Sequence, residues 1–209
     1  METRAELSDA DVVEAVRGAR AAIETVARAM SDRVRLMVYA RLNPSANDLA
    51  GLEDITQQSL EAMMVGLPTL KLHTAAGLRS FASTIVSRRV ADFLRDPAGI
   101  GRGRRAPASL DSTVAGLSSA GPLWQFLSAD ATSPLSAAVR ENQLERVMHE
   151  LGQLRDEYRA VITMAFFDQL STAQIAEQTG TTRQAAAMTL LRAIRALRER
   201  VGGVAPSGD

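Results

Sequence analysis

The segment from Leu170 to Arg200 constrains the fold of this chain more than any other part of the sequence. Ser171 is followed three residues later by Gln174, which is the arrangement of a capping box at the start of a helix. Thr181-Thr182-Arg183-Gln184 repeats this start signal, and Gly180 just before it tolerates the positive φ of a sharp turn. We therefore predict two helices joined by a tight turn, the second of them long and rich in arginine.

One face of the second predicted helix is apolar. Its apolar residues recur at helical spacing, and we expect them to face Ile175 and Ala176 of the first helix. They are Ala186, Leu190, Ile194 and Leu197. Two helices that meet in this way across a glycine turn are typical of a helix-turn-helix, whose second helix enters the major groove of DNA.

The charge of this segment favours nucleic acid as its partner. Residues 181–200 contain five arginines and one acid, Glu199, whereas the whole chain balances 24 basic with 24 acidic residues. Arginine suits paired hydrogen bonds to phosphates and guanine edges. An alternative interpretation is a solvated amphipathic helix, in which arginines near the C-terminal end complement the helix dipole. That alternative does not explain the two start signals and the glycine turn. We therefore interpret the segment as DNA-binding.

Composition predicts an all-helical protein and excludes several kinds of site. Ala, Leu, Arg and Glu dominate, aromatic residues make up 4% of the chain, and the alternation typical of strands is nearly absent. Because the chain has no cysteine and two histidines, we expect no disulfide, no metal site and no cofactor. The sequence has no run of about 20 apolar residues that would cross a membrane, and it does not begin with an apolar signal core. We therefore expect a soluble cytoplasmic protein without a membrane partner.

Prolines and glycines mark two helical domains joined by a connector. Residues 96–134 include four prolines and five glycines, a density that disfavours regular structure. We predict a helical domain over 8–95, a flexible linker over 96–135 with a short helical turn near 123–127, a second helical domain over 136–201 and a disordered tail over 202–209.

Apolar spacing predicts the helices inside each domain. In the first domain a helix capped by Ser8 carries apolar residues as far as Val26, and further helices follow around 34–42, 49–65 and 75–95. In the second domain, helices over 136–151 and 156–167 precede the helix-turn-helix.

Segments of both domains resemble one family, the extracytoplasmic-function (ECF) sigma factors of bacterial RNA polymerase. Residues 52–61, LEDITQQSLE, are similar to the family's acid-acid-apolar-x-Gln signature for core polymerase binding. Residues 78–95 resemble its promoter-melting helix, which ends in an Asp-x-x-Arg pattern, here Asp92 and Arg95. Residues 154–198 are similar to the family's fourth conserved region, and the segments occur in the family's order.

The resemblance implies a transcription initiation subunit whose partners are core RNA polymerase and promoter DNA. The first domain would dock on the clamp helices of the largest polymerase subunit and recognise the −10 element. The second would lie on the flap of the other large subunit and read the −35 element. An anti-sigma protein is a further candidate partner. Four residues that share a helix face by their spacing are assigned to polymerase binding: Glu53, Asp54, Gln57 and Gln58.

The resemblance also assigns DNA-binding residues. Those for the −10 element are Arg79, Arg88, Arg89, Asp92 and Arg95, and the loop over 66–77 would receive a base flipped from the non-template strand. Those for the −35 element are Thr182, Arg183, Gln184, Ala187, Met188, Leu191 and Arg192. By residue chemistry, Gln184 suits adenine and Ala187 suits a thymine methyl group.

The chain departs from the family at several positions. Phe81 stands where many members have Trp, and we interpret it as a core residue. Members often carry a basic residue at the positions of Ala187 and Thr189, so we expect a recognition helix that binds −35 DNA more weakly than usual.

Two alternatives remain open at the level of the sequence. A conventional helix-turn-helix regulator would bind a palindrome as a dimer without polymerase, with the first domain as its dimerisation or effector module. A small helical enzyme is disfavoured because the sequence lacks a phosphate-binding Gly-x-x-x-x-Gly-Lys loop and a Ser/His/Asp grouping.

Overall fold

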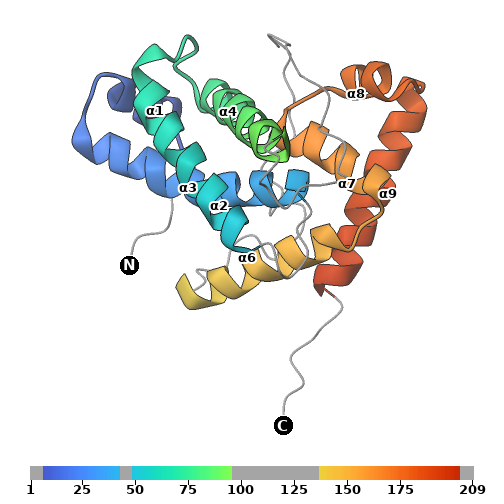
Figure 1. The fold of residues 1–209 in the computed structure, drawn as a ribbon. Helices are drawn as coiled ribbons and strands as arrows, with labels where there is room; N and C mark the ends of the chain where they lie inside the picture. The colour runs from blue at the N-terminus through green and yellow to red at the C-terminus, as the bar shows by residue number, and fades with distance from the viewer. Residues whose placement is uncertain (1–6, 43–48, 96–136, 203–209) are drawn as a thin grey trace. The chain divides into compact units, whose positions relative to one another are not determined.

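The computed structural model describes residues 7–42, 49–95 and 137–202, and these residues form helices without strands, which confirms the predicted all-helical class. The described helices fall into two compact units, with α1 to α4 in the first and α6 to α9 in the second (Figure 1). The predicted linker over 96–135 and the tail from residue 203 lie outside the described residues. Across the described ranges, none of the helices has the length and apolar character needed to cross a bilayer.

The first unit is built from long helices around one apolar core. It contains α1 (Asp9–Val16), α2 (Arg20–Leu42), α3 (Leu49–Gly66), the 3-10 turn η2 (Leu67–Thr69) and α4 (Ala75–Arg95). Helices α2, α3 and α4 each pack against the other two, and α1 packs mainly against α2. Side chains from all four helices are fully buried, among them Val12, Met37, Met63 and Leu78.

The predicted extent of the first two helices is wrong. The chain leaves the first helix after Val16, and α2 then runs without a break from Arg20 to Leu42. The break lies at Gly18, whose φ is 91°. A glycine adopts this left-handed conformation without steric penalty, so it ends a helix that the apolar spacing alone would have continued to Val26.

The start of α1 has a reciprocal cap. The hydroxyl of Ser8 accepts a hydrogen bond from the backbone N–H of Asp11 at 3.2 Å, and the Asp11 carboxylate accepts one from the backbone N–H of Ser8 at 3.0 Å. The Ser8 hydroxyl also donates to the same carboxylate at 2.6 Å. The side-chain hydrogen bond and then the backbone hydrogen bond from Ser8 lower the pKa of Asp11 from its ordinary value.

We expect this cap to stabilise the first unit at neutral pH and to weaken in acid. Because the pKa of Asp11 is lower in the folded than in the unfolded chain, its contribution is fully present above the unfolded pKa and is lost as the pH falls through the folded pKa. Urea denaturation of the wild type and of Asp11→Asn should therefore give a small stability difference that is constant around neutrality and shrinks in acid. A difference that persists unchanged at low pH would contradict this assignment.

The second unit is organised around its last helix. It contains α6 (Ala137–Gly152), α7 (Asp156–Ile162), the π-helical turn η3 (Thr163–Phe167), α8 (Thr172–Thr179) and α9 (Arg183–Gly202). Helix α9 packs against α6, α7 and α8. The largest fully buried side chains of its core are Leu151, Ile162, Phe167, Ile175 and Leu197.

The helix predicted over 156–167 changes type partway. It is α-helical to Ile162 and then widens into the π turn, where the N–H of Asp168 bonds the carbonyl of Thr163 at 3.0 Å. The extra residue in such a turn shifts the phase of the side chains that follow. Phe166 and Phe167 are both buried as a result, although they are neighbours in sequence.

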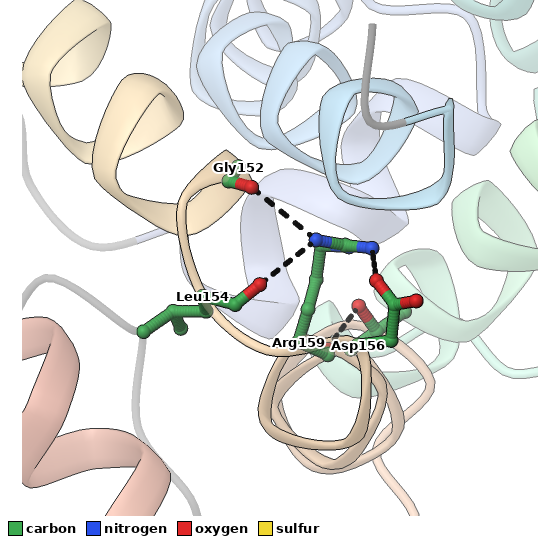
Figure 2. Close-up of polar contacts among 5 residues, drawn as sticks. Gly152, Leu154, Asp156 and Arg159 are labelled. Carbon is green, nitrogen blue, oxygen red and sulfur yellow. Dashed lines mark hydrogen bonds and ion pairs between the residues drawn. The ribbon is translucent and has the colours of Figure 1, made fainter.

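The junction between α6 and α7 is held by Arg159, which the sequence did not single out (Figure 2). Its guanidinium donates hydrogen bonds to the carbonyls of Gly152 at 3.4 Å and Leu154 at 3.2 Å, and it forms an ion pair with Asp156. The Arg159 side chain is 11% exposed. Because the last carbonyls of a helix have no partner within that helix, a nearly buried cation satisfies them and complements the helix dipole.

Candidate nucleic-acid interface

The predicted helix-turn-helix is confirmed in α8 and α9. The hydroxyl of Ser171 accepts from the backbone N–H of Gln174 at 3.4 Å, and the Gln174 side chain accepts from the backbone N–H of Ser171 at 2.9 Å. Gly180 follows α8 with a φ of 66°, as the sharp turn requires. The N–H of Thr181 then bonds the carbonyl of Ala176 at 2.9 Å, which closes the turn.

The cap of α9 lies one residue later than the sequence pattern indicates. The hydroxyl of Thr182 accepts from the backbone N–H of Ala185 at 3.1 Å. The hydroxyl of Thr181 instead lies 2.8 Å from that of Thr179, inside the turn. Two adjacent threonines give the same local signal, and the turn decides which of them precedes the first helical residue. Gln184 is consequently exposed on the helix surface.

The predicted apolar stripe of α9 is correct only in part. Ala186 and Leu197 are buried as expected, but the residue buried between them is Ala193. Leu190 and Ile194 are half-buried at the edges of the contact. A small side chain at position 193 allows the close approach of a neighbouring helix, a preference that spacing rules for large apolar residues do not detect.

The −35 residues proposed from the sequence lie together on one exposed stretch of α9 and its cap. Those exposed to solvent are Thr182, Arg183, Gln184, Met188, Leu191 and Arg192, and Ala187 is half-buried. Residues 184, 188 and 191 follow one another at helical spacing, so they line one face. The buried residues of α9 lie on the opposite side, against α6, α7 and α8. Packing of the opposite side therefore leaves this face of α9 turned toward solvent, directly after the tight turn.

The four residues assigned to polymerase binding share an exposed face of α3. Glu53, Asp54, Gln57 and Gln58 are all exposed, while Ile55 between them is buried. The Glu53 carboxylate lies 3.8 Å from the guanidinium of Arg35 on α2. The Gln57 amide donates to the carboxylate of Glu61 at 3.0 Å. This face is thus acidic and amide-rich, with Glu53 already engaged inside the unit.

The residues assigned to the −10 element divide into two groups on α4. Those near the end of the helix are exposed: Arg88, Arg89, Asp92 and Arg95. Asp92 and Arg95 form an ion pair at 3.0 Å, so the Asp-x-x-Arg pattern is a pairing along one helix. Arg79 is half-buried and lies about two and a half turns before Arg88, which places it on the opposite side of α4. The structure does not bring it together with the others.

Phe81 occupies the contact between α3 and α4. It is half-buried, and its ring lies so close to Gly66 that a Cβ atom there would be 2.7 Å from the ring carbon Cζ. The ring therefore packs against the end of α3, where the glycine makes room for it, but it is not part of the buried core, so the interpretation of Phe81 as a core residue is correct only in part.

Comparison with known families identifies the part of the chain that carries the helix-turn-helix. Residues 144–197 match the family model described as Sigma-70, region 4. The second unit is thus similar to sigma-70 region 4. The match begins within α6 and ends within α9, so it includes α7, the π turn and α8, and it covers about a quarter of the chain. No curated protein matches the chain.

The match to region 4, a DNA-binding domain, supports a DNA-binding role for the second unit. The region 4 match also agrees with the local geometry, because the capping box, the glycine turn and the exposed face of α9 all lie within it.

Proposed function

We propose that this chain is an ECF-type sigma factor that binds core RNA polymerase and directs promoter-specific transcription initiation. The observation that carries the proposal is the region 4 match over a helix-turn-helix, preceded in the chain by a separate helical unit. That first unit presents an acidic and amide-rich face on α3 and a cluster of arginines on α4. One chain thus offers one surface for a protein partner and two surfaces for DNA.

Each surface has a role in this proposal that fits its chemistry. The face of α3 with Asp54 and Gln58 would bind the clamp helices of the largest polymerase subunit, and region 4 would lie on the flap. The exposed end of α4 around Arg88 would contact the −10 element, since arginine pairs well with phosphates. The face of α9 from Arg183 to Arg192 would enter the major groove at the −35 element.

Both DNA contacts belong to one chain, so binding at one DNA element raises the effective concentration of the other unit at its own element. Two weak contacts therefore suffice when polymerase sets the distance between them. The active complex would assemble in the cytoplasm, where polymerase and promoter meet. An anti-sigma protein that held the two units together would block both DNA contacts at once, which makes it a further candidate partner.

Run-off transcription tests the proposal directly. Purified core polymerase, promoter templates from the source genome and the full-length chain should together give discrete transcripts that are absent when the chain is omitted. The chain should sediment as a monomer and should form a one-to-one complex with core polymerase. A free dimer that protects palindromic DNA without polymerase would instead establish a conventional regulator.

We expect Asp54→Ala to weaken binding to core polymerase by about tenfold, or roughly 1.4 kcal/mol. Asp54 is exposed on α3, so the change removes a charge from the proposed contact and leaves the core of the unit intact. Glu24→Ala is the matched control, because it removes one exposed acid from α2, where Glu24 pairs with Arg20 at 3.1 Å. Equal polymerase affinity of the two variants, measured by fluorescence anisotropy, would place the polymerase contact elsewhere.

A further inference from the structure

Two large apolar side chains are exposed on the DNA-facing surface of α9. Met188 is 44% exposed and Leu191 is 60% exposed. In the described ranges, the other large apolar side chains with comparable exposure are Val65 and Leu72, both in the first unit. The core of the second unit is already closed behind α9 by Ala193 and Leu197. The two exposed side chains therefore do not contribute to that core.

The charged neighbours of these side chains indicate what covers them. Gln184 lies one turn before Met188, and Arg195 lies one turn after Leu191, so the four form a continuous strip along α9. Arg183 and Arg192 lie on either side of this strip, and all three arginines are exposed. An apolar centre between cations complements a duplex groove, where phosphates border a floor of base edges. An apolar protein surface would leave these three arginines without an anionic partner.

The floor of the major groove offers one apolar group. Thymine presents its C5 methyl there beside the O4 acceptor, whereas guanine, cytosine and adenine present only hydrogen-bond donors and acceptors. A leucine or methionine pressed against those polar edges would remove their water without replacing the hydrogen bonds, which is unfavourable. The same side chains against methyl groups would bury apolar surface on both partners.

We propose that Met188 and Leu191 determine specificity by contacting thymine methyl groups in the −35 element, a role that rests on the proposed function. Their Cβ atoms lie about 5–6 Å apart along the helix face, and successive bases on one strand lie about 3.4 Å apart. The strip therefore selects thymines at neighbouring positions of one strand. G·C pairs are disfavoured at these positions, because the apolar side chains would leave the hydrogen-bonding groups of the base edges without partners.

Uracil substitution isolates the methyl group, because deoxyuridine pairs with adenine as thymidine does and lacks only the C5 methyl. The probe is a duplex spanning a promoter that the chain activates in run-off transcription, with the −35 window counted from the transcript start. One version carries thymine throughout, a second carries uracil in the −35 window, and a third carries uracil only in the flanks. Binding of the full-length chain with core polymerase is measured to each.

We expect about a tenfold weaker complex when uracil replaces thymine in the −35 window, since two buried methyl groups are lost. Uracil in the flanks should have no effect. Met188→Gln and Leu191→Gln should each reduce the ratio of thymine to uracil binding, and the double variant should abolish it. Val65→Gln, which changes a more exposed apolar residue of the first unit, should leave the ratio unchanged.

Two results would overturn the inference. Equal binding to the thymine and −35 uracil duplexes by the wild-type chain would do so without any variant, and it would leave the proposed function intact. A chain that sediments as a dimer, and becomes monomeric on Leu191→Gln, would show that a second copy covers the strip. If the wild-type chain gives no run-off transcript with core polymerase from any template, so that no such promoter duplex can be chosen, the proposed function itself is rejected.

Discussion

Replacing Arg159 with alanine should lower the free energy of unfolding of the second unit by about 3 kcal/mol, because the change removes charge-assisted hydrogen bonds from a nearly buried site. The guanidinium joins the carbonyls of Gly152 and Leu154 to the carboxylate of Asp156 (Figure 2). Without it, the end of α6 and the start of α7 lose their common partner. Since α7 packs directly on α9, the helix that we propose to read the −35 element loses support as well, and we expect weaker binding to DNA.

Hydrogen exchange with peptide resolution gives the most direct measurement for Arg159. Amides of α7 and of the α9 segment packed on it should exchange faster in Arg159→Ala, whereas those of α1 to α4 should keep their wild-type protection. Arg155→Ala is the matched control, because Arg155 is an exposed residue at the start of α7 whose side chain makes no capping hydrogen bond. Arg159→Lys should give intermediate exchange rates, since the lysine ammonium keeps the positive charge but lacks the planar guanidinium that bonds several acceptors at once. Unchanged protection of α7 in Arg159→Ala would show that the junction does not depend on this side chain.

Local signals allowed the helix-turn-helix to be predicted in detail. The Ser171 cap and the left-handed Gly180 depend on interactions within a few residues, which a sequence displays directly. The cap of α9 was misplaced by one residue because Thr181 and Thr182 carry the same chemistry, and only the geometry of the turn separates them. Gly18 was overlooked for a similar reason, because the apolar spacing on either side of it is compatible with one helix.

Features that depend on contacts between distant segments were not predictable. The burial of Ala193 in place of Leu190 reflects how closely neighbouring helices approach α9, and the role of Arg159 depends on where α6 ends. The pairing of Glu53 with Arg35 likewise requires α2 and α3 to lie side by side. The exposure of the proposed site residues was predictable, because the spacing of the apolar residues determines which face of a known helix is buried. The same phase separates Arg79 from Arg88, a consequence that the resemblance to a family did not reveal.

Gly77→Ala should destabilise the first unit by about 2 kcal/mol, although alanine is normally about 1 kcal/mol better than glycine inside a helix. Gly77 is buried in the first turn of α4, where its N–H bonds the hydroxyl of Thr74 at 3.0 Å. A Cβ atom at this position would overlap the carbonyl oxygen of Leu72 and lie 2.7 Å from its Cβ. Because the obstacle includes backbone, the turn between η2 and α4 would have to move as a whole, and this displacement outweighs the gain in helix propensity.

Two other glycines of the same unit provide graded controls, measured by urea denaturation. A Cβ at Gly66 would meet the end of the Phe81 ring at 2.7 Å, and one at Gly51 would lie 3.3 Å from the ring of Phe93. Both obstacles are ends of side chains that can rotate, so Gly66→Ala should cost less than Gly77→Ala, and Gly51→Ala should cost least. A Gly77→Ala protein as stable as the wild type would show that the Leu72 turn adapts freely. In that case the close approach of this turn to α4 would not stabilise the first unit, and the turn's position would have to be set by η2 and by the hydrogen bond from the N–H of Ala75 to the carboxylate of Asp9 at 2.7 Å.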